Sequence, residues 1–506
     1  MENKNIVLCS DGTGNRDVKA RGTNVFKLYE AVDIHGHKDD RSHKPQVAFY
    51  DEGIGSSAFL PLRIIGGAFG WGFSENVCDL YTELVRVYQP GDSLYLFGFS
   101  RGAYTIRALA GMIQYCGIVD IKEVPNGELE SRVQACWDQF AAVAFKPFQR
   151  DVVRRRNVPT AADGAAAAKR RRSLGAIVHP EHLPTGEPPI EFVGVWDTVA
   201  AVGAPFEELR DLLNFFIPVK FAELVPGGGI KRACHALSID DERQTFHPEL
   251  WNEQGTRPGQ IEQVWFAGAH SNVGGGYPKQ GMSLVALDWM MAEAERCGLR
   301  FIPGDRESIR THQDIHGTLY DSRAGLAVYY RWGPRNIARL CRDHNIHVPK
   351  IHVSVFERIA NGTGWYAPGN IPFACEVVTT PNPAATGTAP WPDQSVLQAM
   401  QQAIIHPSLP EGRSLLDTVT RASRSGKLAY HTFLGSTLLL LWWLWNPPSF
   451  LEQVAGPLEP RVLVVGLIAV IGVIVLVWSH RVDRTLDDWY SSFWDRRRDS
   501  LRKLLR

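Results

Sequence analysis

The chain has 506 residues, with 54 Lys and Arg against 54 Asp and Glu, and its formal net charge is zero. This balance excludes the general affinity for nucleic acid that a strongly basic chain has. A hydrophobic content of 44% is enough for a large core, and the length favours one large domain with appendages or two to three domains. The eight cysteines include no Cys-x-x-Cys pair, so the sequence predicts neither a zinc site nor a disulfide framework.

The chain opens on a predicted buried strand. Residues 5–10 form a continuous apolar run without a signal peptide before it, which predicts a cytoplasmic setting for this part. The polar loop Asp11-Gly12-Thr13-Gly14-Asn15 follows. Ligands bind at the carboxyl ends of strands in open α/β sheets. Gly12 or Thr13 is therefore a candidate donor of a backbone N–H to a substrate oxyanion, with Asp11 bracing the loop. A plain Asx-type turn is the alternative.

Strand and helix patterns then alternate as in an α/β protein. We predict a helix over residues 23–32, a strand over 46–50 and an amphipathic helix over 74–88. The glycine-rich run 66–72 lacks the spacing of a phosphate loop or a dinucleotide fingerprint. We interpret it as a flexible loop.

The next strand carries the pattern on which the functional prediction rests. An apolar run over 93–99 ends in Gly-x-Ser-x-Gly, from Gly98 to Gly102 with Ser100 at its centre, and a helical pattern follows. A serine between two glycines at a strand-to-helix turn is typical of the nucleophile elbow of α/β-hydrolases, where any larger side chain at either glycine position would collide with the turn. Such a turn exposes the hydroxyl above the sheet edge and aims the N–H of Arg101 at the reacting carbonyl.

A region resembling an insertion covers about residues 126–189. It contains two basic clusters, at 154–156 and 169–172. Basic clusters in a neutral chain are most often solvated surface, and attraction to anionic lipid headgroups is the alternative.

Two later strands end in the residue types that a serine nucleophile needs. Asp197 follows the apolar run 190–196, and His270 follows a run that begins at 261. A serine hydroxyl becomes an effective nucleophile when an imidazole takes its proton, and a carboxylate holds that imidazole in the right tautomer. The order Ser, Asp, His is that of the α/β-hydrolase triad. The rivals are Asp240 and Asp241 for the acid, and His235, His247 and His352 for the base.

Four ordered motifs make a resemblance specific. They are Asp11-Gly-Thr-Gly-Asn15, Gly98-Phe-Ser-Arg-Gly-Ala-Tyr104, Val195-Trp-Asp-Thr-Val199 and His270-Ser-Asn-Val-Gly-Gly-Gly-Tyr277. Over about residues 5–375 the chain resembles the uncharacterised α/β-hydrolase domain shared with the phospholipase effectors of bacterial type VI secretion systems. The resemblance implies a serine hydrolase with Ser100, Asp197 and His270 in the triad positions, and glycerophospholipid substrates. One departure is Asn272, where the family often carries Asp.

The C-terminal part differs most from a soluble enzyme. Residues 428–445 and 462–479 are predominantly apolar and free of Asp, Glu, Lys and Arg. At ~1.5 Å per residue each spans ~27 Å, close to the ~30 Å hydrocarbon thickness of a bilayer. We therefore predict a transmembrane helical hairpin over 428–479, with two buried core helices as the alternative. The basic, aromatic-rich tail 480–506 is typical of an interfacial helix on an anionic leaflet. Basic residues flank the outer ends of the hairpin, so the catalytic domain and both termini are predicted to be cytoplasmic.

Together these patterns predict an α/β-hydrolase-like, mostly parallel sheet with flanking helices over residues 1–425, then the hairpin and the tail. The predicted protein is an integral protein of a bacterial inner membrane, a serine hydrolase that cleaves lipid esters, and the expected activity is that of a phospholipase. Its expected partners are lipid substrate and the bilayer, and the reaction needs no metal or organic cofactor. The alternatives are a carboxylesterase or thioesterase acting on a non-lipid acyl ester, and a non-catalytic membrane scaffold that keeps the fold.

Overall fold

The structure is a computed structural model, and it describes residues 3–12, 22–53, 69–144, 179, 190–199, 229–322, 333–381, 394–404 and 460–505, with single positions between 428 and 445. These residues form one sheet of eight strands in the order β2-β1-β3-β4-β5-β6-β7-β8, and every neighbouring pair is parallel. The mostly parallel α/β fold predicted from the sequence is confirmed. The strands are β1 Asn5–Ser10, β2 Gln46–Asp51, β3 Ser93–Phe99, β4 Ile190–Trp196, β5 Ile230–Ser238, β6 Ile261–Phe266, β7 Lys350–His352 and β8 Glu376–Val378.

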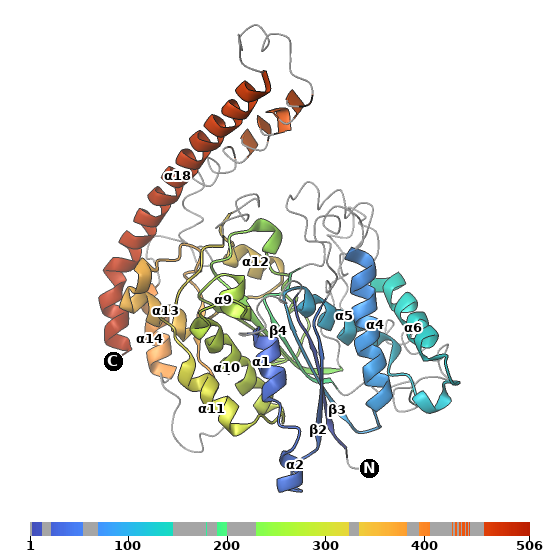
Figure 1. Ribbon diagram of the computed structural model, residues 1–506. Helices are drawn as coiled ribbons and strands as arrows, with labels where there is room; N and C mark the ends of the chain where they lie inside the picture. Colours follow the sequence, from blue (N-terminus) through green and yellow to red (C-terminus); the bar gives the residue numbers. More distant parts are fainter. Residues whose placement is uncertain are drawn as a thin grey trace.

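Helices cover both faces of this sheet (Figure 1). Because successive side chains of a strand point to opposite faces, β1 buries Ile6 and Leu8 in one core and Val7 and Cys9 in the other. The first core lies under α4 Phe69–Val87, α5 Arg101–Cys116 and α6 Leu129–Ala144. The second lies under α1 Asn24–Ala31, α10 Gly281–Arg296 and α11 Pro303–His312. The remaining described helices are α2 Gly36–Asp39, α9 His270–Gly274, α12 Ile337–Asp343, α13 Val353–Asn361, α14 Gln394–Ile404 and α18 Pro460–Leu504, with short 3₁₀ turns at Ile121–Glu123, Gln244–Phe246 and Thr363–Trp365.

Two regions differ from their sequence prediction in detail. The glycine-rich run predicted as a loop continues into α4, which begins at Phe69. Glycine weakens a helix interior by about 1 kcal/mol, and the burial of Phe73 against the core offsets that cost. The predicted insertion over 126–189 begins with α6, which packs on α4 and α5. Its two basic clusters lie outside the described residues.

The C-terminal part requires a correction. Within the described ranges, no helix is both long enough and apolar enough to cross a membrane. This finding overturns the predicted integral-membrane location, and it leaves the predicted hairpin over 428–479 without support. The second apolar segment is instead the first half of α18, a single helix of 45 residues that continues through the charged tail. Leu440 of the first segment and Val464 of α18 bury each other. The predicted boundary at residue 425 lies outside the described residues and stays a prediction.

The tail also contacts protein where lipid contact was predicted. Its aromatic and leucine side chains join a third core with α13 and α14, and the last turns of α18 run along these helices (Figure 1). Trp494 is buried and donates its indole N–H to Pro368 O at 2.8 Å. The apolar face that suggested an interfacial helix therefore completes the fold of the domain. The buried tail residues are Tyr490, Phe493, Trp494 and Leu501.

Candidate active site

Ser100 occupies the turn between β3 and α5. Its backbone has φ 57° and ψ −120°, a combination that side-chain-bearing residues rarely adopt and that surrounding structure must enforce. Two hydrogen bonds to the neighbouring strand end do so. The Ser100 N–H donates to Trp196 O at 3.0 Å, and Ser100 O accepts from the Val199 N–H at 3.3 Å. The turn is therefore fixed by β4, the strand that leads to Asp197.

The two glycines of the turn allow three elements to meet. A Cβ at Gly98 would lie 2.5 Å from Gly102 O, and one at Gly102 would lie 2.2 Å from Ser10 O. Both distances are below any real contact of a Cβ atom. Glycine at these positions lets α5 pack against β3 and β1, which places Ser100 where the strand order of the sheet reverses. This is where open α/β sheets bind ligands.

Asp197 and His270 come together at the same edge of the sheet. The Nδ1 atom of His270 lies 2.6 Å from Oδ2 of Asp197, and both side chains are buried. Since the carboxylate can only accept, Nδ1 carries the proton and Nε2 is left as a base. Nε2 is buried and has no hydrogen-bond partner among the described residues. Asp197 follows β4 and His270 begins α9, so parallel strands bring together residues 73 positions apart.

The structure adds a residue that no sequence pattern indicated. Arg335 is completely buried and binds both carboxylate oxygens of Asp197, with Nη1–Oδ1 at 2.6 Å and Nη2–Oδ2 at 2.9 Å. Burial by itself disfavours the carboxylate, but Arg335 and His270 outweigh it, and the pKa of Asp197 lies well below its usual range. Asp197 is thereby held as an anion. Arg335 does not follow any strand that was predicted from the sequence, and it lies 138 positions after Asp197 in the chain.

The rival residues all have other partners. Asp240 accepts from the Gly268 N–H at 2.6 Å and from the Tyr366 hydroxyl at 2.8 Å. Asp241 accepts from the backbone N–H of His270, not from its ring, and forms an ion pair with Arg243. The rival histidines are tied elsewhere: His235 accepts the Thr198 N–H at Nε2, His352 caps α13, and His247 lies near Gly333 O.

The predicted oxyanion loop is only partly described. A Cβ at Gly12 would lie 3.1 Å from Cβ of Ser100, so the described start of this loop, Asp11 and Gly12, lies against the turn. The N–H of Gly12, however, donates to the neighbouring carboxylate of Asp11 at 2.6 Å. The carboxylate of Asp11 also accepts from the hydroxyls of Tyr50 and Thr23. Its bracing role stays a prediction. Thr13 lies outside the described residues, as does Asn15.

Asn272, the departure from the resembled family, has a local structural role. Its Oδ1 accepts from the N–H groups of Ala269 and Tyr320, both at 3.2 Å, and its Nδ2 donates to Thr318 O at 3.0 Å. A carboxylate could make the first two contacts but not the third. The amide thus ties the loop of His270 to the segment around Tyr320.

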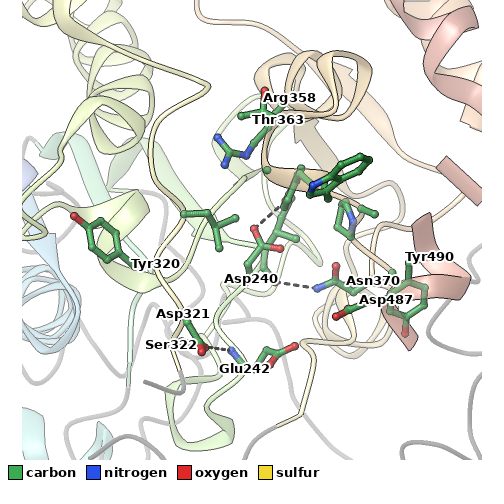
Figure 2. A pocket seen from close by; sticks show the side chains of 18 of the residues that line it. Asp240, Glu242, Tyr320, Asp321, Ser322, Arg358, Thr363, Asn370, Asp487 and Tyr490 are labelled. Atoms are coloured by element: carbon green, nitrogen blue, oxygen red, sulfur yellow. Dashed lines mark hydrogen bonds between the residues drawn. The ribbon is translucent and has the colours of Figure 1, made fainter. Parts of the chain in front are cut away.

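A cavity of about 670 Å³ lies beside this loop (Figure 2). Asp240 projects into the centre of the cavity. Arg358 lies on one side of it, and Asn370 lies on the other side together with Tyr490, which belongs to α18. The described lining residues include none of Ser100, Asp197 and His270. Burial raises the pKa of Asp240 to about 6. Within the described ranges, no group of three or more His, Cys, Asp and Glu side chains could hold a metal ion.

Residues 4–293 place the chain in a known family. A model of the catalytic domain of Tle1-like phospholipase effectors of the type VI secretion system matches residues 4–293. The chain belongs to this family. The Tle1-like match contains Ser100, Asp197 and His270 and ends before Arg335.

A curated protein and a solved structure are also similar to this Tle1-like chain. The uncharacterized protein YEL023C of Saccharomyces cerevisiae is 22% identical over 424 residues, which cover 63% of this chain and 60% of that protein. The chain thus spans three fifths of the length of this curated relative. A solved structure of the Tle1 effector bound to the VgrG spike from the type 6 secretion system matches 69% of this chain and 85% of its own, with 14% identity and a TM-score of 0.31.

Proposed function

We propose that this Tle1-like chain is a serine hydrolase that cleaves acyl ester bonds of phospholipids, with Ser100 as nucleophile, His270 as general base and Asp197 as the residue that orients His270. One observation carries the proposal: the buried contact of 2.6 Å between Asp197 and His270 leaves Nε2 as a base without a described partner. Ser100 stands on a strained turn at the end of the strand next to β4.

The proposed reaction is acyl transfer to water. Ser100 Oγ attacks the ester carbonyl and gives its proton to Nε2 of His270, and Asp197 stabilises the imidazolium. Collapse of the tetrahedral intermediate releases the alcohol, which takes the proton from Nε2. Water then repeats the sequence on the acyl-enzyme and restores Ser100.

The oxyanion needs backbone donors at the turn. The N–H of Arg101 is the first, because it follows the nucleophile at the start of α5. The second donor is proposed from Gly12 or Thr13, and Gly12 lies against Ser100. The Gly12 N–H donates to the carboxylate of Asp11, so it can donate to the oxyanion only if that hydrogen bond is broken. Thr13 is the alternative donor.

The proposal of a phospholipid substrate rests on membership in the Tle1-like phospholipase effector family. A carboxylesterase or thioesterase would use the same three residues, so the substrate has to be tested directly. Purified protein is incubated with mixed micelles of phosphatidylethanolamine and phosphatidylglycerol, with a short-chain soluble ester and with an acyl-thioester, and released fatty acid is measured by mass spectrometry. We expect release from the phospholipids that is lost in Ser100→Ala.

The outcomes separate the parts of the proposal. Hydrolysis of the soluble ester or thioester alone would replace the phospholipid by another acyl substrate. Hydrolysis that persists in Ser100→Ala would exclude Ser100 as nucleophile. Absence of hydrolysis and of labelling by a fluorophosphonate probe in the folded wild-type protein would favour a non-catalytic scaffold.

A further inference from the structure

Asp197 has more hydrogen-bond donors around it than a carboxylate that only orients a histidine needs. Besides His270 and the guanidinium of Arg335, the backbone N–H of Ser238 donates to Oδ1 at 3.0 Å and its hydroxyl contacts Oδ2 at 3.3 Å. A carboxylate offers about four lone-pair directions. All of them are used, and the guanidinium alone binds both oxygens.

Arg335 is itself held rigidly. Its Nη1 also donates to Ser238 O and its Nη2 to Phe246 O, both at 2.6 Å. Four hydrogen bonds in the plane of the guanidinium fix its orientation, and a bidentate arginine then fixes the plane of the carboxylate that it binds. The carboxylate cannot turn about its own bond without breaking these contacts. Asp197 Oδ2, which also contacts Nη2 of Arg335 and the Ser238 hydroxyl, is therefore held where it faces Nδ1 of His270.

The position of Asp197 makes such support necessary. Its backbone has a φ of 38°, in the left-handed region that non-glycine residues seldom adopt. Burial also makes an unpaired carboxylate costly. Without a fixed counter-ion, Asp197 would be free to relax away from His270 or to take up a proton.

We infer that Arg335 is a positioning residue of the proposed active site, which keeps Asp197 ionised and its Oδ2 aimed at His270. The inference rests on the proposed function. It extends the site beyond the matched catalytic domain, because Arg335 lies after residue 293, where the family match ends. The part of the chain that follows the matched domain thus contributes to the catalytic geometry.

Several charged groups surround the pair and bear on any pH dependence. Arg335 and His270 face Asp197 directly. His235 lies beside it on β5 and stays neutral, because burial lowers its pKa to about 3. Asp241, paired with Arg243, faces the backbone of His270. Arg335 is the cation that binds the carboxylate oxygens of Asp197, so its removal is expected to shift the protonation of Asp197 more than any other single change.

The test compares Arg335→Met with Arg306→Met. Arg306 is also a buried arginine, and it forms ion pairs with Asp288 of α10 and with Glu295. In Arg335→Met we expect kcat to fall on the order of 10- to 100-fold with KM nearly unchanged. The acid limb of the kcat/KM profile moves to higher pH, because the cation that opposes protonation of the Asp197–His270 pair is gone. Arg306→Met loses stability but keeps the wild-type pH profile.

Two further measurements make the inference independent of folding defects and of the substrate. Arg335→Lys keeps the charge but not the bidentate contact, and we expect it to restore most of the acid limb and part of kcat. The low-field proton resonance of the Asp197–His270 hydrogen bond is observed without any substrate. It should be present in the wild type and in Arg306→Met, and lost or moved in Arg335→Met.

An unchanged acid limb and kcat in a folded Arg335→Met, or an unchanged low-field resonance, overturns the positioning role. If the wild-type protein cleaves no ester, the proposed function fails, whereas the resonance still decides whether Arg335 positions Asp197. The two failures are thus distinguishable.

Discussion

The ring of Phe99 lies against the imidazole of His270, with 4.6 Å between the two ring centroids. The residue before the proposed nucleophile therefore packs on the proposed general base. Phe99 is buried, and Gly274 of α9 lies so close that a Cβ there would come 1.9 Å from the ring. The end of β3 and the helix that begins with His270 are locked by this contact.

This packing predicts that Gly274→Ala damages the site. The added methyl group must push the Phe99 ring or α9 aside, so we expect a loss of about 1–3 kcal/mol in the free energy of unfolding. Because a displacement of about 1 Å can cost about 10²-fold in rate, ester hydrolysis should fall more than stability alone explains. Urea unfolding and initial rates on one substrate measure the two effects.

The matched control is Gly304→Ala in α11, where an added Cβ meets nothing within 4 Å. It should be neutral or slightly stabilising, since alanine is the better helix former. Wild-type rates in Gly274→Ala would contradict the contact between Phe99 and α9.

The three proposed triad residues should behave as a unit. His270→Ala is expected to lower kcat/KM by about 10³-fold or more, and Ser100→Ala/His270→Ala should be little worse than either single change. The reason is that the hydroxyl without its base, or the base without its hydroxyl, already loses the proton transfer. His247→Ala, which changes a half-buried histidine near Gly333, is the control and should keep most activity. Additive losses in the double variant would exclude a shared step.

Burial of two neutral histidines predicts acid-sensitive stability. Burial lowers the pKa of His352 to about 3, and that of His235 likewise to about 3, whereas an unfolded histidine titrates near 6.5. Below that pH the unfolded chain binds protons that the folded chain excludes. The stabilisation is therefore present above pH 6.5 and is lost as the pH falls toward 3, by about 2 kcal/mol per histidine at pH 5.

His352→Asn tests this sign, since asparagine can still cap α13. The difference in unfolding free energy between pH 7.5 and pH 5 should be smaller in this variant than in the wild type by about 2 kcal/mol. An equal difference in both proteins would contradict a buried neutral His352.

The sequence predicted the parts of the fold that local pattern determines. β1, β3 and β4 are continuous apolar runs, and they appear at the predicted residues. β5 went unpredicted because His235 and Arg232 interrupt its apolar run, although the first is buried in the sheet and the second forms ion pairs with Glu262 and Glu293. Such polar residues are satisfied only by partners that are distant in sequence.

The candidate site divides in the same way. Ser100, Asp197 and His270 follow strands that are visible in the sequence, so the pattern alone was enough to propose them. The structure places Asp197 and His270 in contact, and their catalytic roles stay a prediction. Arg335 was missed because the sequence alone predicts that an arginine is exposed to solvent, unless the carboxylate that it binds is known. The tail was misjudged for a related reason: aromatic residues at helical spacing among arginines serve a lipid surface or a protein groove equally well. Only the positions of α13 and α14 distinguish the two.

The corrected position of the tail gives the last prediction. Trp494 is 2% exposed in the core with α13 and α14, and its indole N–H has a protein acceptor, whereas Trp489 on the same helix is 44% exposed. If the tail completes the domain, Trp494→Ala should lower the free energy of unfolding by about 3–5 kcal/mol, because it leaves a cavity and an unpaired Pro368 carbonyl. Trp489→Ala should change it by less than about 0.5 kcal/mol. Both variants are measured by urea unfolding in lipid-free buffer. Equal, small effects would mean that the tail does not pack on the domain, and a larger effect of Trp489→Ala would mean that the opposite face of α18 makes the contact.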